Sequence, residues 1–369
     1  MKKYERTMAE IDLEALEHNY HILRKRAGCA LMAVVKADAY GHGANRVSRV
    51  LDRAVADWLA VATAEEARLL RVAHVQLPIL VLGYVGPTHA KSMARNGIAI
   101  TVTGPEHAAE LSEAAVKGKF SIRAHFKLDT GMSRLGFSSV EELEAALALP
   151  GLEAEGLCSH LAVSDEPDNP FTELQETRFA EARERLERAG HTFKFIHCAN
   201  SGRVVNCKGT VPGNLARAGI ALYGCGPGTQ MGLRPVMSLW APVMLIREVK
   251  AGETVSYGRR WTAGRASRIA VLQYGYADGY HRALSGKGHV VLHGHQCPVV
   301  GTVCMDMLMA DVTDVPEAEA GDRALVFGRE RRRGDAIEVS LDELAEKAGT
   351  ISYELLCAVS ARVPRKYIG

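Results

Sequence analysis

The chain has 369 residues, of which 47% are hydrophobic and 24% charged, the composition of an ordinary soluble globular protein. Its formal net charge of +2 argues against a nucleic-acid-binding protein, which normally carries a concentrated basic stripe. No apolar stretch approaches the ~20 residues of a membrane-spanning helix, and the N-terminus lacks the apolar segment of a secretory signal. The eight cysteines form no C-x-x-C pair and no metal-ligand spacing. We therefore expect a cytoplasmic protein with reduced cysteines, no metal and no membrane or nucleic-acid partner.

Helices and strands are predicted to alternate from residue 10 onward. Asp12 is the expected N-cap of a helix that runs to about Arg26, and an apolar strand from Leu31 to Val35 ends at Lys36. Eight strands alternating with helices within residues 1–232 indicate a (β/α)8 TIM-type barrel. An open doubly wound sheet is the alternative, but no G-x-G-x-x-G follows the first strand. The later strands are predicted at Trp58–Ala62, Ile79–Leu82, Ile98–Val102, Ser121–Lys127, Ala154–Ser159, Phe193–Cys198 and about Leu215–Leu222, with helices such as Ala64–Ala73, Pro105–Lys117, Val140–Leu149 and Thr172–Ala189.

The pattern changes after Gly226, and residues 233–369 are predicted to form a mostly antiparallel C-terminal β-domain. The basic run from Arg329 to Arg333 is interpreted as a solvated loop. His293 and His295 are interpreted as a polar loop rather than a metal site, because no further ligands cluster with them. The strands of this domain are predicted at Val243–Val249, Ser267–Tyr274, Val290–His293, Val299–Val303, Leu308–Val312 and Arg323–Phe327, with one helix at about Leu341–Lys347.

Lys36 stands out because it ends a buried strand. A desolvated lysine has a lowered pKa and can attack a carbonyl to form a Schiff base, although such a side chain can also extend into solvent. Barrel enzymes carry their chemistry at the carboxyl ends of the strands. The polar residues at the predicted strand ends, which make a site on this face the better interpretation, are Lys36, Lys127, Arg134, His160, Asn200, Ser201 and Arg217.

The segment Ala33–Gly43 resembles the pyridoxal-phosphate (PLP) attachment signature of alanine racemases, in which the lysine holds the cofactor as an internal aldimine. The resemblance extends over nearly the whole chain and keeps the order of that family's motifs. It implies a barrel followed by a β-domain, and the interconversion of L- and D-alanine that supplies D-alanine for peptidoglycan. The further segments that carry it are Lys127–Gly136, Glu155–His160, His197–Ser201, Arg217–Gly224, Val255–Gly258, Gly275–Gly279, Cys304–Asp306 and Ile351–Glu354.

Racemisation requires a base on each face of the planar carbanion. Lys36 can serve one face, and the resemblance implies that Tyr257 serves the other. A tyrosine with a pKa of ~10 needs stabilising neighbours to act as a base, and His160 and Arg217 are the candidates. By resemblance Arg217 faces the pyridine nitrogen of the cofactor. Because arginine keeps its proton, that nitrogen should stay unprotonated, and we expect this to suppress transamination.

The resemblance also implies the other positions of the site. His160 supports the pyridine ring, and Arg134 holds the substrate carboxylate in a forked geometry. Ser133 departs from the glycine expected in many relatives. The family forms a head-to-tail homodimer with shared active sites, so an isolated monomer should be inactive. The remaining implied positions are Asn200, Ser201, Gly219, Ile220, Tyr40 and Tyr353 for the cofactor, Met305 and Asp306 for the substrate, Lys127 as a possible carbamylated lysine, and Asp165, Tyr276 and Arg282 at the entrance.

Other functions remain open from the sequence. A serine or broad-specificity amino-acid racemase would share the scaffold, and Met305 and Tyr353 favour a small methyl side chain. A non-catalytic PLP-binding homeostasis protein shares the barrel and its lysine, but residues 237–369 argue against it. A related decarboxylase would place an acidic residue, not Arg217, at the pyridine nitrogen. A Schiff-base aldolase would leave Tyr257 and the second domain unexplained.

Overall fold

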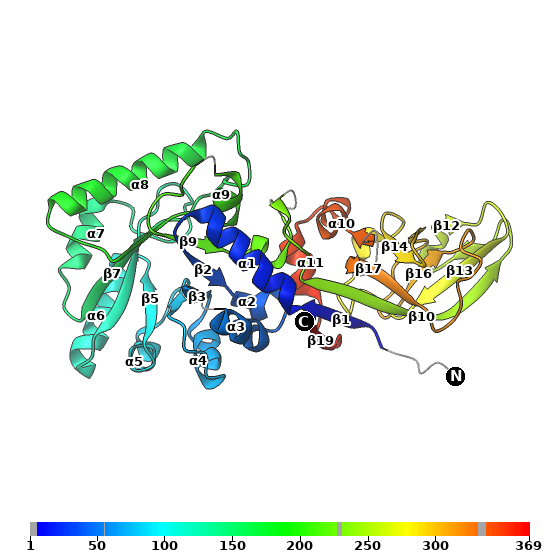
Figure 1. Cartoon of the computed structure of the whole chain (residues 1–369), viewed down its shortest axis with the longest axis horizontal. Helices are drawn as coiled ribbons and strands as arrows, with labels where there is room; N and C mark the ends of the chain where they lie inside the picture. Colours follow the sequence, from blue (N-terminus) through cyan, green and yellow to red (C-terminus); the bar gives the residue numbers. More distant parts are fainter. Residues whose placement is uncertain (1–5, 55, 208, 227–230, 331–336) are drawn as a thin grey trace. The chain divides into compact units, whose positions relative to one another are not determined.

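A computed structural model of the chain describes residues 6–54, 56–207, 209–226, 231–330 and 337–369 (Figure 1). These residues form two compact units. The barrel unit comprises residues 16–39 and 43–233, and the C-terminal unit comprises residues 234–369 together with residues 40–42 and the described residues up to Ala15. The first strand and a short segment after Lys36 thus belong to the C-terminal unit, although both precede most of the barrel in sequence.

The barrel unit contains a parallel sheet of eight strands in the order β8-β7-β6-β5-β4-β3-β2-β9. Two backbone hydrogen bonds bring its edge strands together, from Asn214 N to Ile196 O and from Arg217 N to Ala199 O, each 3.0 Å long. The near-closed barrel confirms the predicted fold class. The strands are β2 (Ala30–Val34), β3 (Trp58–Val61), β4 (Ile79–Val81), β5 (Ile98–Val102), β6 (Ile122–Lys127), β7 (Leu152–Cys158), β8 (Phe195–His197) and β9 (Leu215–Ala218).

The predicted helices are confirmed to within about two residues, and Figure 1 shows helices along the outside of the barrel strands. Asp12 accepts a hydrogen bond from Ala15 N (2.9 Å), as expected of the cap of the first helix. Thr63 and Glu66 form a capping box at the start of α4. The helices are α1 (Leu13–Ala27), α3 (Ala44–Arg53), α4 (Ala64–Val72), α5 (Pro87–Arg95), α6 (Pro105–Gly118), α7 (Val140–Leu147), α8 (Phe171–Arg188) and α9 (Ser201–Asn206).

The predicted extent of the last barrel strand, Leu215–Leu222, is wrong at its carboxyl end. β9 stops at Ala218, and a 3-10 helix η1 (Ile220–Tyr223) follows Gly219. All four residues of η1 are buried. An apolar run that is buried on all sides has no periodicity that separates a strand from a helix, which explains the error.

The C-terminal unit is built on a nine-stranded sheet among the described residues. Its longest path is β15-β14-β17-β10-β1-β19, while β13 pairs with β10 and β16, and β18 pairs with β17. The N-terminal strand β1 (Met8–Asp12), which the sequence did not predict, pairs antiparallel with β10. The other elements are β10 (Met237–Val249), β11 (Thr254–Val255), β12 (Trp261–Thr262), β13 (Ser267–Leu272), β14 (His289–Leu292), β15 (His295–Pro298), β16 (Leu308–Asp311), β17 (Arg323–Glu330), β18 (Ile337–Val339), β19 (Arg365–Ile368), α10 (Leu341–Ala348) and α11 (Ser352–Ala358).

Two predictions for this unit are wrong. The strand expected at Val299–Val303 lies earlier, as β15, because His293 (φ 51°) and Gly294 (φ 89°) form a tight hairpin turn between β14 and β15. The basic run is not wholly a loop, since Arg329 and Glu330 belong to β17. Residues 331–333 of that run lie outside the described residues, as do residues 1–5 and 227–230. None of the described helices is long and apolar enough to cross a membrane.

Candidate active site

Lys36 is half-buried and stands just beyond β2, where the backbone takes a rare conformation. The four residues of Ala37–Tyr40 all have φ between 52° and 55°, the left-handed region, at about 1–2 kcal/mol for each residue other than glycine. Two carboxylates hold this left-handed turn. Glu66 accepts from the first amide of the turn, and Asp38 accepts from Ala44 N, each at 2.7 Å. Strain of this kind persists where surrounding contacts fix it, commonly at functional sites, and here it follows directly on Lys36.

Arg217, near the end of β9, is buried and makes five contacts through its two terminal nitrogens. It donates to the carbonyl oxygens of Ser159 (2.7 Å), Cys198 (2.9 Å) and His197 (3.1 Å). It also donates to Nδ1 of His160 (3.1 Å) and to Nδ1 of His197. None of these contacts uses Nε, so within the described part of the chain the Nε–H is left for an acceptor that the chain does not supply. Such a donor fits the ring nitrogen of a pyridine cofactor.

His160 is held as a neutral ring beside this guanidinium. Because its Nδ1 accepts from Arg217, its proton resides on Nε2. Burial, and then the charges of Arg217, Arg134, Lys127 and Lys36, keep the pKa of His160 well below its usual value. The charges that act on His160 are thus those of four other predicted site residues of the barrel unit.

Lys127 is the last residue of β6 and is buried. Its ammonium donates to the carbonyl oxygen of Leu135. Burial lowers the pKa of Lys127, and the positive charges of Arg217 and Arg134 lower it further. A lowered pKa increases the fraction of neutral amine, which is the form that reacts with carbon dioxide. The residue therefore suits the carbamylation that the sequence suggested.

Arg134 is exposed and lies in a loop with a constrained backbone. The carboxylate of Asp129 accepts from the amides of Gly131 (2.9 Å) and Met132 (2.8 Å). Ser133 has a φ of 54°, a left-handed conformation that favours glycine, at the position where the resemblance implies glycine in many relatives. The loop thus fixes the backbone that carries Arg134.

Ser201 and Gly219 meet at the amino ends of α9 and η1. The Ser201 hydroxyl accepts from Gly219 N (2.8 Å), and both residues are buried together with Ile220. A hydroxyl and backbone amides at the starts of short helical turns are the donors that phosphate groups use. The corner defined by Ser201, Gly219 and Ile220 fits the phosphate of a cofactor.

The side chain of Asn200 is occupied within the chain. Its Oδ1 accepts from Arg203 N (3.2 Å) and from the Ser164 hydroxyl, and its Nδ2 donates to Leu161 O (3.2 Å). Asn200 therefore caps α9 and ties it to the loop after β7. Asp165 is an exposed residue of that loop.

Among the described residues of the C-terminal unit, Tyr257 is the most exposed large hydrophobic side chain, at 72%. Its backbone is fixed all the same, since it lies between Ser256 (φ 68°) and Gly258 (φ 72°) and its carbonyl accepts from the Thr302 hydroxyl (2.7 Å). The short 3-10 helix η3 (Tyr257–Arg259) begins at this residue. The unit presents the tyrosine on a rigid support and leaves its ring uncovered.

Met305 and Tyr276 are brought together by two backbone hydrogen bonds. These run from Tyr276 N to Cys304 O (3.0 Å) and from Ala277 N to Met305 O (2.9 Å). Arg282 begins the 3-10 helix η4 (Arg282–Leu284) further along. Both Met305 and Tyr276 are more than two-fifths exposed.

Asp306 has a partner that the sequence did not reveal. Arg362 donates to Asp306 Oδ1 at 2.8 Å and lies 3.3 Å from Asp278 Oδ1. The ring centroids of Tyr40 and Tyr353 are 5.9 Å apart in the same unit, and burial raises the pKa of Tyr40. No spacing pattern links Arg362 to Asp306, so only the folded chain could disclose the pair.

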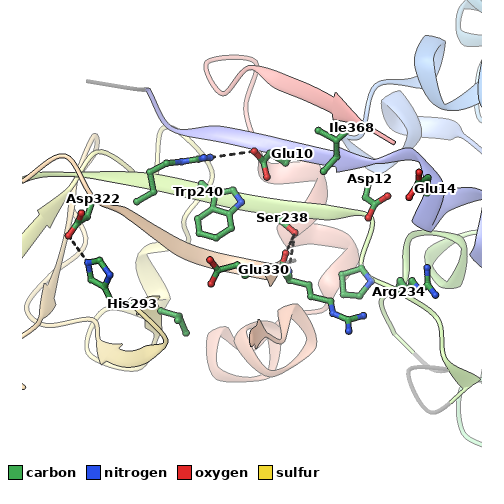
Figure 2. A pocket seen from close by; sticks show the side chains of 14 residues that line it. Glu10, Asp12, Glu14, Arg234, Ser238, Trp240, His293, Asp322, Glu330 and Ile368 are labelled. Carbon is green, nitrogen blue, oxygen red and sulfur yellow. Dashed lines mark hydrogen bonds and ion pairs between the residues drawn. The ribbon is translucent and has the colours of Figure 1, made fainter. Parts of the chain in front are cut away.

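A separate cavity of about 740 Å³ in the C-terminal unit is lined largely by charged side chains (Figure 2). Figure 2 shows Asp322 directed at His293, with an Nε2–Oδ2 distance of 2.7 Å. Arg323 lies 3.6 Å from Glu10 in the same cavity. None of the predicted site residues lines it. The described residues also contain no cluster of three or more His, Cys, Asp or Glu side chains able to hold a metal ion.

Comparison with known proteins agrees with this geometry. The family model "Alanine racemase, N-terminal domain" matches residues 11–227, and "Alanine racemase, C-terminal domain" matches residues 236–367. The chain is 41% identical to an alanine racemase of Desulforamulus reducens, over 98% of each chain. The crystal structure of an alanine racemase from Streptomyces lavendulae superposes with a TM-score of 0.92 and 36% identity, covering 100% of this chain and 98% of that one. An alanine racemase from Bacillus anthracis, solved with bound L-Ala-P, gives a TM-score of 0.89 and 34% identity over 100% and 96% of the two chains. The chain therefore belongs to the alanine racemase family and is an amino-acid racemase.

Proposed function

We propose that the chain interconverts L-alanine and D-alanine with PLP attached to Lys36, and that it supplies D-alanine for peptidoglycan. The observation that carries this proposal is Arg217, a buried guanidinium whose Nε–H is left for an outside acceptor and whose strand, β9, pairs with the strand that precedes Lys36. The Bacillus anthracis relative with bound L-Ala-P supports a ligand derived from alanine.

The chain's own residues divide the work of cofactor binding. The Arg217 Nε–H donates to the pyridine nitrogen, and neutral His160 supports the ring. The Ser201 hydroxyl, which accepts from the Gly219 amide and so keeps its own O–H to donate, and the Ile220 amide bind the phosphate, with Gly219 holding the hydroxyl in place. The hydroxyls of Tyr40 and Tyr353 complete the phosphate site, and Asn200 fixes the helix that starts at Ser201.

Proton transfer is assigned to two side chains. When bound to the substrate amino group, PLP withdraws electrons from the α-carbon and makes its proton removable. The Lys36 amine exchanges that proton on one face, and the Tyr257 hydroxyl exchanges it on the other. Arg134 binds the substrate carboxylate through two parallel hydrogen bonds and so holds the α-carbon between the two bases.

The remaining residues shape the pocket around the substrate. We assign Lys127 as a carbamate, because its lowered pKa favours the neutral amine and the resulting anion would balance Arg134. Met305 and Asp306 border the substrate, with Asp306 held by Arg362. Asp165, Tyr276 and Arg282 line the entrance.

We further propose that residues 1–232 bind the cofactor and that residues 233–369 serve the site of a second subunit in a head-to-tail homodimer. Large exposed apolar patches on soluble proteins mark interaction surfaces. The eight free cysteines accord with a cytoplasmic location. Six of the twelve exposed large hydrophobic residues in the described part of the chain lie in or next to the segments of the predicted site and support this interface, namely Tyr257, Tyr276, Met305, Met307, Ile351 and Tyr353.

The absorption spectrum of the purified protein tests the central proposal. We expect a band near ~420 nm from the lysine-linked cofactor, together with turnover of both enantiomers of alanine. Alanine should turn over faster than serine. Absence of the band would refute the cofactor assignment, whereas faster turnover of serine would refute only the choice of substrate.

Arg217→Glu is expected to change which reaction follows proton removal. The carbonyl oxygens around Arg217 favour the protonated form of a glutamic acid, which can share a proton with the pyridine nitrogen and strengthen electron withdrawal. Racemisation should fall at least about tenfold, while conversion of the cofactor to pyridoxamine phosphate rises. Both rates can be measured by absorbance with alanine. Arg217→Lys, which keeps the charge, is the control, and an unchanged transamination rate in the Glu variant would contradict the role of Arg217.

A further inference from the structure

The interior of the barrel carries a row of polar side chains that the proposed mechanism does not use. A TIM barrel is usually filled with branched apolar residues. Here Arg123 and His125 of β6, Glu155 of β7 and His197 of β8 form a continuous series that ends on Arg217 of β9. His125 and His197 are fully buried. Burying this many polar groups costs free energy unless each has a hydrogen-bonding or charged partner. The contacts from one side chain to the next therefore show how the groups stabilise one another.

The hydrogen bonds along the row all run in the same direction from donor to acceptor. The guanidinium of Arg217 can only donate, so His197 Nδ1 must accept and the proton of His197 lies on Nε2. His197 Nε2 is 2.9 Å from His125 Nδ1, which must therefore accept as well. The proton of His125 then lies on Nε2, which makes no hydrogen bond within normal geometry in the described part of the chain and faces Glu155 Oε2 at an ion-pair distance of 3.5 Å.

Glu155 is held as an anion at the far end of the row. Arg123 donates to its two oxygens at 2.6 Å and 3.1 Å. Burial alone would raise the pKa of Glu155, but the hydrogen bonds from His125 and Arg123 outweigh it and lower the pKa to about 2. Burial and then the charge of Arg217 keep the pKa of His197 well below its usual value, so that ring is neutral.

The surroundings of His125 are shaped to fit its ring. A Cβ at position 156 would lie only 2.5 Å from His125 Nδ1, so Gly156 leaves the space that the ring fills. The rings of Trp58 and Phe195 pack against His125 at centroid distances of 5.4 Å and 6.0 Å and exclude water. This fitted space, the hydrogen bond at Nδ1 and the carboxylate that faces Nε2 together fix the orientation of the ring.

We propose that Glu155, acting through His125 and His197, is a positioning residue that fixes the proton of each imidazole on Nε2 and thereby orients Arg217. The part of this inference that concerns the cofactor rests on the proposed function, because Arg217 has a ring nitrogen to face only if PLP binds. The direction of the row does not depend on that function.

Glu155→Gln is the sharpest variant. Arg123 would keep the amide oxygen as its acceptor, which turns the amide NH2 toward His125 Nε2. His125 would then carry its proton on Nδ1 and donate to His197 Nε2. His197 would in turn present an Nδ1–H to Arg217, so that two donors meet. The guanidinium must move away from its present position.

The test measures the protonated nitrogens directly. In cofactor-loaded protein with 15N-labelled histidine, NMR distinguishes a protonated from a bare ring nitrogen, and single His→Gln variants assign the signals. We expect both rings to carry their proton on Nε2 in the wild type and on Nδ1 in Glu155→Gln. Glu153→Gln, an exposed position on the same strand with the same change of charge, is the matched control and should leave both rings as in the wild type.

Kinetics provide the second readout. Mutation of a residue that hydrogen-bonds to a ligand-binding residue typically lowers activity 10–100-fold. We therefore expect kcat for alanine to fall about tenfold in Glu155→Gln, with KM within about twofold of the wild type. Glu155→Asp keeps the anion and should restore the wild-type proton positions, which maintains the test if the Gln variant folds poorly. Wild-type rings protonated on Nδ1, or rings unchanged by Glu155→Gln, would overturn the proposal. If the protons lie where we expect but alanine is not turned over, the proposed function would be refuted and the proposal about Glu155 would remain valid.

Discussion

Lys36→Ala is expected to abolish the absorption band near ~420 nm and to reduce alanine racemisation by at least about 10³-fold. Under the proposed function the variant loses both the covalent tether of the cofactor and the base on one face. The other donors, such as Ser201 and Arg217, remain, so PLP should still bind non-covalently. The spectrum and the rates in both directions are the measurements.

A surface lysine provides the control for this variant. Lys117→Ala, at an exposed position on α6, should leave the spectrum and the rates unchanged. A small primary amine added to Lys36→Ala should restore part of the band and part of the activity, because it replaces the missing amino group. A Lys36→Ala protein that keeps the wild-type band would show that another lysine holds the cofactor.

Tyr257→Phe is expected to slow proton exchange on one face of the substrate by about 10²–10⁴-fold and to affect the other face much less. The substitution removes one hydroxyl and keeps the ring, and the backbone at this position is fixed by Thr302. Exchange of the α-hydrogen with deuterated solvent, measured separately from L- and D-alanine, gives the two rates. Tyr84→Phe, another exposed tyrosine, is the control. An equal loss of exchange from both enantiomers would count against two separate bases.

Mixing the two inactive variants tests whether each site draws on two subunits. Random reassociation of Lys36→Ala with Tyr257→Phe makes half of the dimers heterodimers, and a shared site leaves each of these with one intact site of two. Activity should therefore recover to about one quarter of the wild-type level. If both residues act within one chain, every site carries a defect and no activity returns.

The alternation of apolar runs and helices was enough to predict all eight barrel strands, because strands buried on both faces form continuous apolar segments. The sequence could not place β1 in the second sheet, since Met8 pairs with Trp240, and a pairing this distant leaves no local signal. The strand predicted at Val299–Val303 was misplaced for a similar reason, because the position at which this strand begins depends on a single turn.

The strand ends predicted Lys36, Lys127 and Arg217 as site residues, whereas no prediction of the row behind Arg217 was made from the sequence. A signal was present, since Arg123, His125 and Lys127 are polar at every second position and therefore lie on one face of β6. Because the interior of a barrel is expected to be apolar, that pattern alone did not predict that these side chains lie inside the barrel. Glu155 gained meaning only once its distance to His125 was known.

The left-handed turn after Lys36 has a consequence for the order of folding. Four residues at about 1–2 kcal/mol each amount to roughly 4–8 kcal/mol, comparable to the whole net stability of many domains. Such a turn cannot arise early from local preference, since its first amide is held by Glu66, which itself depends on α4. We therefore expect Lys36 to take up its position only after β2, β3 and α4 have assembled. If PLP attaches to Lys36 as proposed, the lysine would be presented to the cofactor in its final geometry only once these elements are in place.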